Sequence, residues 1–124
     1  MPIVFAKNAR EFNIPNVTFT SRAAPAIGST ENSLWQFSMA PHAPAAIHQL
    51  TREEIIVAIS GKAVVILGDQ KHHISKGDTI IIPPYIDFGL ANESEDVFEG
   101  IAVLPVGTQA IMGSEPPFTP PWAT

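Results

Sequence analysis

Residues 54–84, EIIVAISGKAVVILGDQKHHISKGDTIIIPP, decide the fold of this chain. Two runs rich in β-branched residues, 54–60 and 62–67, are separated by a glycine, which indicates two short strands. The next pair, Gly68-Asp69, is typical of a hairpin turn, because glycine tolerates the positive φ that such turns need. An apolar run over 79–82 then stops at two prolines, which cannot donate to a sheet ladder. The stretch therefore predicts consecutive antiparallel strands joined by tight turns.

The same pattern continues on both sides of this stretch. Residues 33–40 alternate most clearly, because Trp35, Phe37 and Met39 fall on one face while Gln36 and Ser38 fall on the other. A period of two residues indicates a strand with one buried face. Further short strands are expected over residues 17–22, 46–50, 70–74, 87–92, 97–104 and 109–112.

Helical signals are weak throughout the chain. Twelve prolines and eight glycines are spread along it, and no window longer than about ten residues keeps an apolar stripe of helical period. Residues 7–13 could form one helical turn, which Pro15 would end. Parallel α/β folds are excluded because no crossover helices are available. We predict an all-β sandwich or barrel of about eight to ten short antiparallel strands.

The composition of the chain excludes several classes of site and partner. The 124 residues correspond to one domain at roughly 100–200 residues per domain. The absence of cysteine excludes disulfides, zinc–thiolate sites and cysteine nucleophiles. Seven basic against twelve acidic residues give a net charge of −5, which argues against nucleic-acid partners. No apolar run approaches the ~20 residues that cross a bilayer, and the N-terminus lacks a secretory pattern. We therefore expect no membrane partner and a cytoplasmic location.

Two segments carry motif-like spacing. In the first segment, six residues separate Glu54 from Gly61. In the second segment, gaps of five, four and three residues separate four positions, Gly77, Pro83, Phe88 and Asn92. These segments resemble the two conserved motifs of the cupin superfamily, whose members are small jelly-roll β-barrels. The anchor positions are His48, Leu50, Glu54 and Gly61 in the first motif and Gly77, Pro83, Phe88 and Asn92 in the second.

The resemblance implies a metal site with an incomplete set of donors. A typical cupin holds its metal with three histidines and one glutamate. His48 and Glu54 stand at two of these positions, whereas Leu50 and Phe88 replace the other two and have no lone pair to offer. Catalytic divalent metals usually take three or more protein ligands. Iron, manganese, nickel or zinc would therefore be held weakly here or would be absent.

Without a metal, His48 and Glu54 would face a pocket whose other walls are apolar. Burial would raise the pKa of the Glu54 carboxyl unless a protonated His48 paired with it. Such a pair could carry out general acid–base catalysis, or it could be a structural pair that closes the core. The predicted apolar walls are Trp35, Phe37, Leu50, Ile56, Phe88 and Leu90.

Three functions are compatible with this pattern. The first is binding of a small, largely apolar or aromatic organic molecule in the barrel, with His48 and Glu54 as its polar groups. The second is an enzyme that uses the same two residues, with or without a metal, for oxygenase, decarboxylase, isomerase or lyase chemistry as the resemblance implies. The third is a closed structural or regulatory barrel. A fold alone does not choose among these functions.

The chain reads as one cupin domain over residues 1–124. An N-terminal arm with strands occupies 1–32, the cupin core 33–104 and a proline-rich tail 105–124. Phe118 and Trp122 in the tail are expected to pack on the barrel or on a partner subunit, because disordered tails are usually poor in aromatics. The resemblance also implies a homodimer that pairs through sheet edges and exchanged terminal strands.

Overall fold

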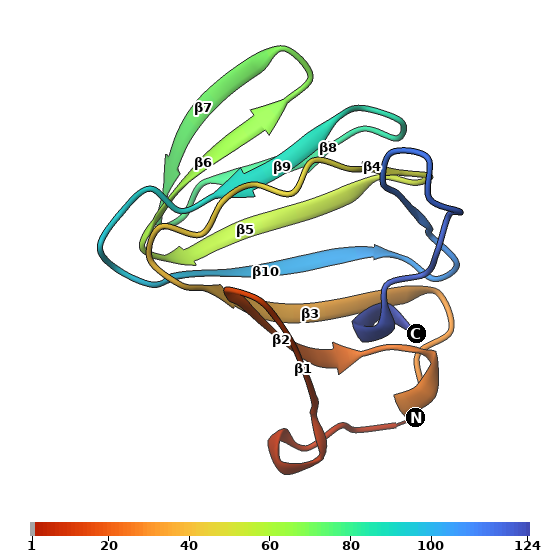
Figure 1. Cartoon of the computed structure of the whole chain (residues 1–124). Helices are drawn as coiled ribbons and strands as arrows, with labels where there is room; N and C mark the ends of the chain where they lie inside the picture. The colour runs from red at the N-terminus through yellow and green to blue at the C-terminus, as the bar shows by residue number, and fades with distance from the viewer. Residues whose placement is uncertain (1) are drawn as a thin grey trace.

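The computed structural model describes residues 2–124, which form eleven strands in two facing layers (Figure 1). The first layer is a six-stranded sheet in the order β1 (Arg10–Ile14), β2 (Val17–Ala23), β3 (Asn32–Met39), β10 (Phe98–Pro105), β5 (Glu54–Ser60) and β8 (Thr79–Ile82). The second layer contains a three-stranded sheet, β7 (Gln70–Ser75), β6 (Lys62–Leu67) and β9 (Phe88–Ala91), and the pair β11 (Ala110–Ile111) and β4 (Gln49–Leu50). Short 3-10 turns lie at Ala6–Asn8, Pro25–Ile27 and Pro121–Ala123.

Every strand pair in this arrangement is antiparallel. The all-β jelly-roll prediction is therefore confirmed, and β5, β6 and β8 have the predicted bounds. The strand count exceeds the expected range by one because β1 was not predicted, whereas β4 and β11 are shorter than expected, with two residues each. Within residues 2–124, no helix is long and apolar enough to cross a membrane.

The predicted helical turn over residues 7–13 is wrong. A single 3-10 turn at Ala6–Asn8 gives way to β1, which pairs along its whole length with β2. The two strands meet at Pro15-Asn16, where Asn16 adopts a φ of 69°, a conformation that asparagine tolerates better than most residues. Pairing with a neighbouring strand satisfies the backbone of β1, and this tertiary gain outweighs the local preference of the sequence.

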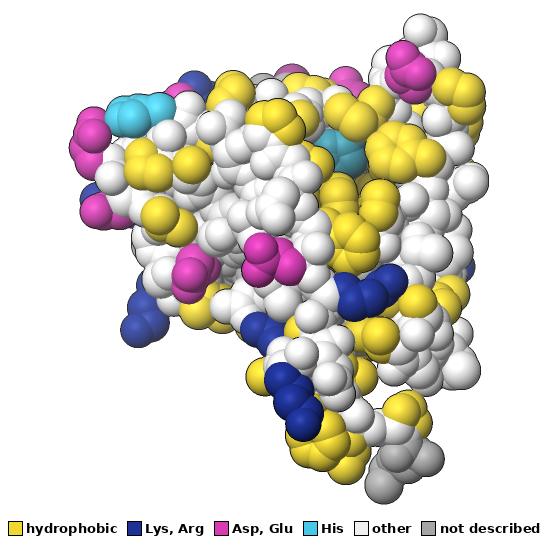
Figure 2. Space-filling view, turned by 60° about the horizontal axis from the view of Figure 1, so that its bottom comes forward, with side chains coloured by type: hydrophobic (Ala, Val, Ile, Leu, Met, Phe, Trp, Pro, Cys, Tyr) yellow, Lys and Arg dark blue, Asp and Glu magenta, His cyan; other side chains and the backbone are white. Residues whose placement is uncertain are grey.

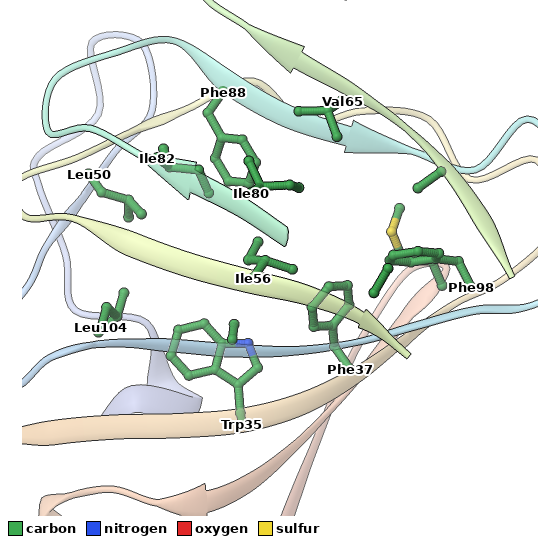
Figure 3. Close-up of a cluster of buried hydrophobic side chains, with 14 of the residues drawn as sticks. Trp35, Phe37, Leu50, Ile56, Val65, Ile80, Ile82, Phe88, Phe98 and Leu104 are labelled. Carbon is green, nitrogen blue, oxygen red and sulfur yellow. The ribbon is translucent and has the colours of Figure 1, made fainter. Parts of the chain in front are cut away.

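The core forms where large side chains of one strand face small residues of the next. Trp35 and Phe37 on β3 lie opposite Ala102 and Gly100 on β10. A Cβ atom added at Gly100 would lie 2.7 Å from Cζ of Phe37, so the ring occupies the space that a larger residue would need. Side chains from both layers point toward one another in the interior (Figure 3).

Two of the motif residues serve the fold. Gly61 has a φ of 81°, and a Cβ atom there would collide with the backbone carbonyl of Val97. Asn92 is fully buried, and its amide oxygen accepts from the backbone and hydroxyl of Ser94. Its amide nitrogen donates to three backbone carbonyls, those of Met39, Ala40 and Asp96. These motif positions therefore fix loop geometry and need no role in chemistry.

The C-terminal tail packs on the barrel of its own chain. Trp122 stacks on Phe19 with ring centroids 3.6 Å apart and planes 3° apart, and it meets Trp35 edge-on at 6.5 Å. Side-chain donors also hold two backbone carbonyls of the chain end, Ser33 that of Ala123 at 2.7 Å and Arg10 that of Thr124 at 2.9 Å. The tail thus contacts the barrel of its own chain through Trp122.

Replacing Trp122 with alanine is expected to lower the free energy of unfolding by about 3 kcal/mol, because the change removes a large packed ring and leaves a cavity. Trp122→Phe is the matched control and should recover most of the loss, since a phenyl ring can still stack on Phe19. Urea unfolding followed by circular dichroism measures both variants. A loss below about 0.5 kcal/mol for Trp122→Ala, the size of an ordinary surface substitution, would show that the stack contributes little in solution.

Candidate functional site

A cavity of about 200 Å³ lies inside the barrel. All six apolar residues expected as pocket walls line it, and so do His48 and Glu54. These two are the only ionisable side chains on its wall within the described chain. On one face of the molecule, hydrophobic side chains gather around a histidine (Figure 2). The walls are completed by residues of the first two strands, β3, β10, β11 and the tail, among them Ile14, Val17, Phe19, Met39, Leu104, Met112, Phe118 and Trp122.

Strand alternation places Glu54 on the cavity wall. It is the first residue of β5 and pairs with Ile82 of β8. Because successive side chains of a strand point to opposite faces, Glu54 and Ile56 face the interior whereas Ile55 is exposed. The position of the glutamate is thus set by the same hydrophobic pattern that forms the strand.

A backbone bridge places His48 beside Phe88. The His48 N–H donates to the Phe88 carbonyl at 3.0 Å, and the Phe88 N–H donates to the His48 carbonyl at 2.9 Å. The two rings meet edge to face with centroids 5.1 Å apart. Leu50 lies two residues after His48 and therefore faces the same side. The bridge joins the residue that precedes β4 to the first residue of β9.

The Glu54 carboxyl group is almost completely removed from water. Its residue is 5% exposed, and burial raises the pKa of Glu54 from 4.5 to about 8. Desolvation is the only cause of this shift, since no hydrogen-bond donor or cation within residues 2–124 offsets it. Near neutral pH the group is therefore a neutral carboxylic acid, which donates from one oxygen and accepts at the other.

His48 does not pair with Glu54 in this structure. Its Nδ1 lies 2.9 Å from the carbonyl oxygen of Ala46. A carbonyl can only accept, so Nδ1 carries a proton and donates it to Ala46. The sequence left two alternatives, a protonated His48 that pairs with Glu54 or an unpaired Glu54 carboxyl with a raised pKa. The structure shows the second.

The donor set does not fit the metal site that the resemblance implied. The four motif positions 48, 50, 54 and 88 all lie on the cavity wall, but Leu50 and Phe88 offer only hydrocarbon. Residues 2–124 hold no cluster of three or more histidine, cysteine, aspartate or glutamate side chains suited to a metal ion. Two other histidines are engaged at the surface, His42 with Glu95 and His72 with Gln70.

Several cavity residues were not identified from the sequence as part of the site. Phe19 and Val17 share one face of a predicted strand. The alternation predicted that they lie on the same face, but it did not predict that this face lines the cavity. Leu104 lies near the end of β10, and Met112 follows β11. Nothing in the sequence links these two residues to His48. These contacts depend on which strands become neighbours across the barrel.

Comparison with known proteins agrees with this geometry. The profile of the Cupin domain family matches residues 35–104, more than half of the chain. No protein of curated function matches the sequence. Solved structures share the fold at low sequence identity, which establishes the fold alone.

Three of these structures illustrate the likeness. The polyketide cyclase RemF from Streptomyces resistomycificus is 18% identical with a TM-score of 0.74, over 85% of this chain and 79% of its own. An RmlC-like cupin from Shewanella frigidimarina NCIMB 400 is 13% identical with a TM-score of 0.72, over 83% and 88%. A chain from the structures of the DMSP lyases RdDddP and RnDddQII is 16% identical with a TM-score of 0.69, over 79% and 53%. With its two motifs, its jelly-roll topology and the family match, this chain belongs to the cupin superfamily.

Proposed function

We propose that this cupin binds a small, largely apolar or aromatic organic molecule in its central cavity, with Glu54 and His48 as the polar contacts. The observation that carries the proposal is a cavity of about 200 Å³ with apolar walls and these two polar side chains. Ligand sites typically combine apolar walls with a few placed polar groups. An apolar cavity of ~150 Å³ holds benzene, so the volume here suits a ring with small substituents.

The structural relatives support the use of this barrel for small molecules. One is described as a polyketide cyclase and another as a DMSP lyase. Both descriptions concern the chemistry of small organic compounds, although at such low identity neither gives the ligand of this chain. The cavity walls of this chain, rather than the likeness, define the size and polarity of its ligand.

Titration with small aromatic compounds, followed by the fluorescence of Trp35 and Trp122, tests the proposal. Both indoles lie on the cavity wall, so a bound ring should change their emission in a saturable way. Phe88→Ala should weaken binding by about tenfold or more, since it removes a buried wall. Ile81→Ala is the matched control, because Ile81 is 60% exposed on the outer face. If no compound gives a saturable change, the closed structural barrel becomes the better reading.

A metal-free acid–base enzyme is the second candidate. The supporting observation is a buried carboxyl group with a raised pKa at Glu54 and an imidazole ring at His48 on one cavity wall. A general acid is most effective when its pKa lies near the working pH, and that of Glu54 does. The two functions separate at Glu54→Gln, which would abolish turnover in an enzyme but change affinity only modestly in a binding protein.

The homodimer and the cytoplasmic location stay predictions of the sequence. The tail, one of the two segments expected to exchange between subunits, packs on its own barrel through Trp122. In the N-terminal segment, Ile3 and Phe5 are 72% and 60% exposed, and both terminal segments stay candidates for exchange in a dimer.

A further inference from the structure

A second hollow, of about 140 Å³, lies on the outer face of the six-stranded sheet. Side chains alternate along β3, so Trp35 and Phe37 are buried in the barrel whereas Gln36 and Ser38 face outward into the hollow. β3 lies between β2 and β10 (Figure 1). Polar side chains from all three strands line the hollow: Thr18, Thr20, Arg22, Gln36, Ser38 and Glu99. The hollow is therefore on the opposite side of β3 from the central cavity.

Short hydroxyl side chains form the floor of this hollow. Ser38 pairs with Thr18 of β2 and with Glu99 of β10. Gln36 pairs with Thr20 of β2. Residues paired in this way lie side by side on one face of a sheet. The three hydroxyl groups therefore form one patch, in which each can both donate and accept a hydrogen bond.

Two opposite charges flank the floor, and each stands at an irregularity of the sheet. The register between β2 and β3 shifts between Ser21 and Ala23, which makes Arg22 the extra residue. The register between β10 and β5 shifts between Glu99 and Gly100. Bulges re-aim side chains and are over-represented beside active sites. Both charged side chains of the hollow thus leave strands whose regular pairing is interrupted at that point.

Neither charge is neutralised within residues 2–124. The two ion pairs of this part of the chain join His42 to Glu95 and Lys71 to Glu93. Arg22 instead donates to Oε1 of Gln36 at 3.2 Å. Oε2 of Glu99 accepts from the hydroxyl of Ser60 at 3.4 Å. Because both of these partners are neutral, the guanidinium and the carboxylate line one hollow as uncompensated charges.

The two charges limit the chemistry of a ligand. An anion would contact Arg22 favourably but would be repelled by Glu99, and a cation would meet the reverse situation. A molecule that carries both charges satisfies both groups. The volume is close to that of the ~150 Å³ cavity that holds benzene, so it suits a molecule of about six non-hydrogen atoms.

We propose that this hollow is a second binding site, for a small zwitterion of the amino-acid class. The carboxylate of the ligand contacts the Arg22 guanidinium, and its ammonium group contacts the Glu99 carboxylate. The hydroxyls of Thr18, Thr20 and Ser38 contact the polar atoms between them. The site is independent of the central cavity, so it adds to the proposed function and does not rest on it.

Three probes with one three-carbon chain test this proposal: β-alanine, propionate and propylammonium. The first carries both charges, the second only the carboxylate and the third only the ammonium group. Wild-type protein should bind β-alanine about tenfold or more tightly than either of the others, because each lacks one hydrogen bond between charged groups. Two-dimensional amide NMR of the full chain measures the three affinities and locates the residues that respond.

Single charge removals assign each end of the ligand. Arg22→Gln should abolish the preference for β-alanine over propylammonium, and Glu99→Gln should abolish its preference over propionate. Lys62→Gln and Asp69→Asn are the matched controls, because they remove the same charges from exposed positions in and beside β6. Both controls should keep the wild-type preferences.

The comparison of the three probes on wild type decides the proposal even if a variant fails to fold. Equal affinity for the three probes, or no binding of β-alanine, would overturn it. Propionate bound as tightly as β-alanine, with loss in Arg22→Gln only, would make the hollow a simple anion site and would overturn it too. A preference for β-alanine that survives both charge removals would place the binding elsewhere on the molecule, with the same consequence.

Discussion

Raising the pH from about 5 to about 8.5 should lower the free energy of unfolding by about 4 kcal/mol more in wild type than in Glu54→Gln. The cause is the buried carboxyl at the start of β5. Its pKa lies near 8 in the folded protein and returns to an ordinary value when the chain unfolds. Few other titratable groups in a protein of this size should change the free energy of unfolding with pH by this much.

The sign follows from proton binding. Between the two pKa values the unfolded chain has released the Glu54 proton while the folded chain still holds it. The folded state therefore binds more protons, and its stability falls as the pH rises. The contribution of Glu54 is fully present below pH 4.5 and is lost as the pH rises through about 8. Above that range both states are ionised and the difference stops growing.

Urea unfolding of wild type and Glu54→Gln at several pH values measures this contribution. Subtracting the two curves removes the effect of every other titrating group, His48 included, since both proteins share them. A pH-independent difference between the two proteins would contradict the prediction. It would mean that the carboxyl is already ionised in the folded barrel.

Restoring two histidines should create a metal site. In Leu50→His/Phe88→His, four donors would line one cavity, because positions 48, 50, 54 and 88 all lie on its wall. Three nitrogens and one carboxylate form a suitable set for a divalent transition metal. Removing a residue that only hydrogen-bonds to a metal ligand costs about 10–100-fold in affinity, so adding two direct ligands should raise affinity for Zn²⁺ or Ni²⁺ by more than a hundredfold.

Isothermal titration and plasma mass spectrometry measure the gain against wild type, with each single variant as a matched control. The apo double variant should melt below wild type, because two polar rings enter an apolar wall, and the metal should recover that loss by binding only the folded state. Adding Glu54→Ala to the double variant should remove most of the gain. A folded double variant without any increase in affinity would show that these four side chains do not converge.

The fold was predictable because it depends on local patterns. The alternation of β3 and the glycine-bounded runs of β5 and β6 reflect burial of one strand face, which each segment expresses alone. β1, Arg-Glu-Phe-Asn-Ile, was missed because its alternation covers only two apolar residues, and the segment is held as a strand by pairing with β2. Its conformation is a property of the pair.

The site was predictable in part for the same reason. Motif spacing and alternation identified eight side chains that all line the cavity. The relation between His48 and Glu54 could not be obtained this way, because it depends on a hydrogen bond from His48 to Ala46. The stack of Trp122 on Phe19 joins residues at opposite ends of the sequence, a contact that no local pattern encodes.

The packing of the tail has a consequence for the rate at which a ligand exchanges. Opening the cavity through a sheet would break a cooperative ladder of backbone bonds. Lifting the tail breaks the Ala110–Phe118 bridge, the two bonds from Ser33 and Arg10, and the contacts of Trp122 with Phe19 and Trp35. Phe118, Pro120 and Trp122 of the tail line the cavity, so the residence time of a bound molecule would depend on how often the tail detaches. Affinity and lifetime would then be set by different parts of the chain, the first by β5 and the second by the tail.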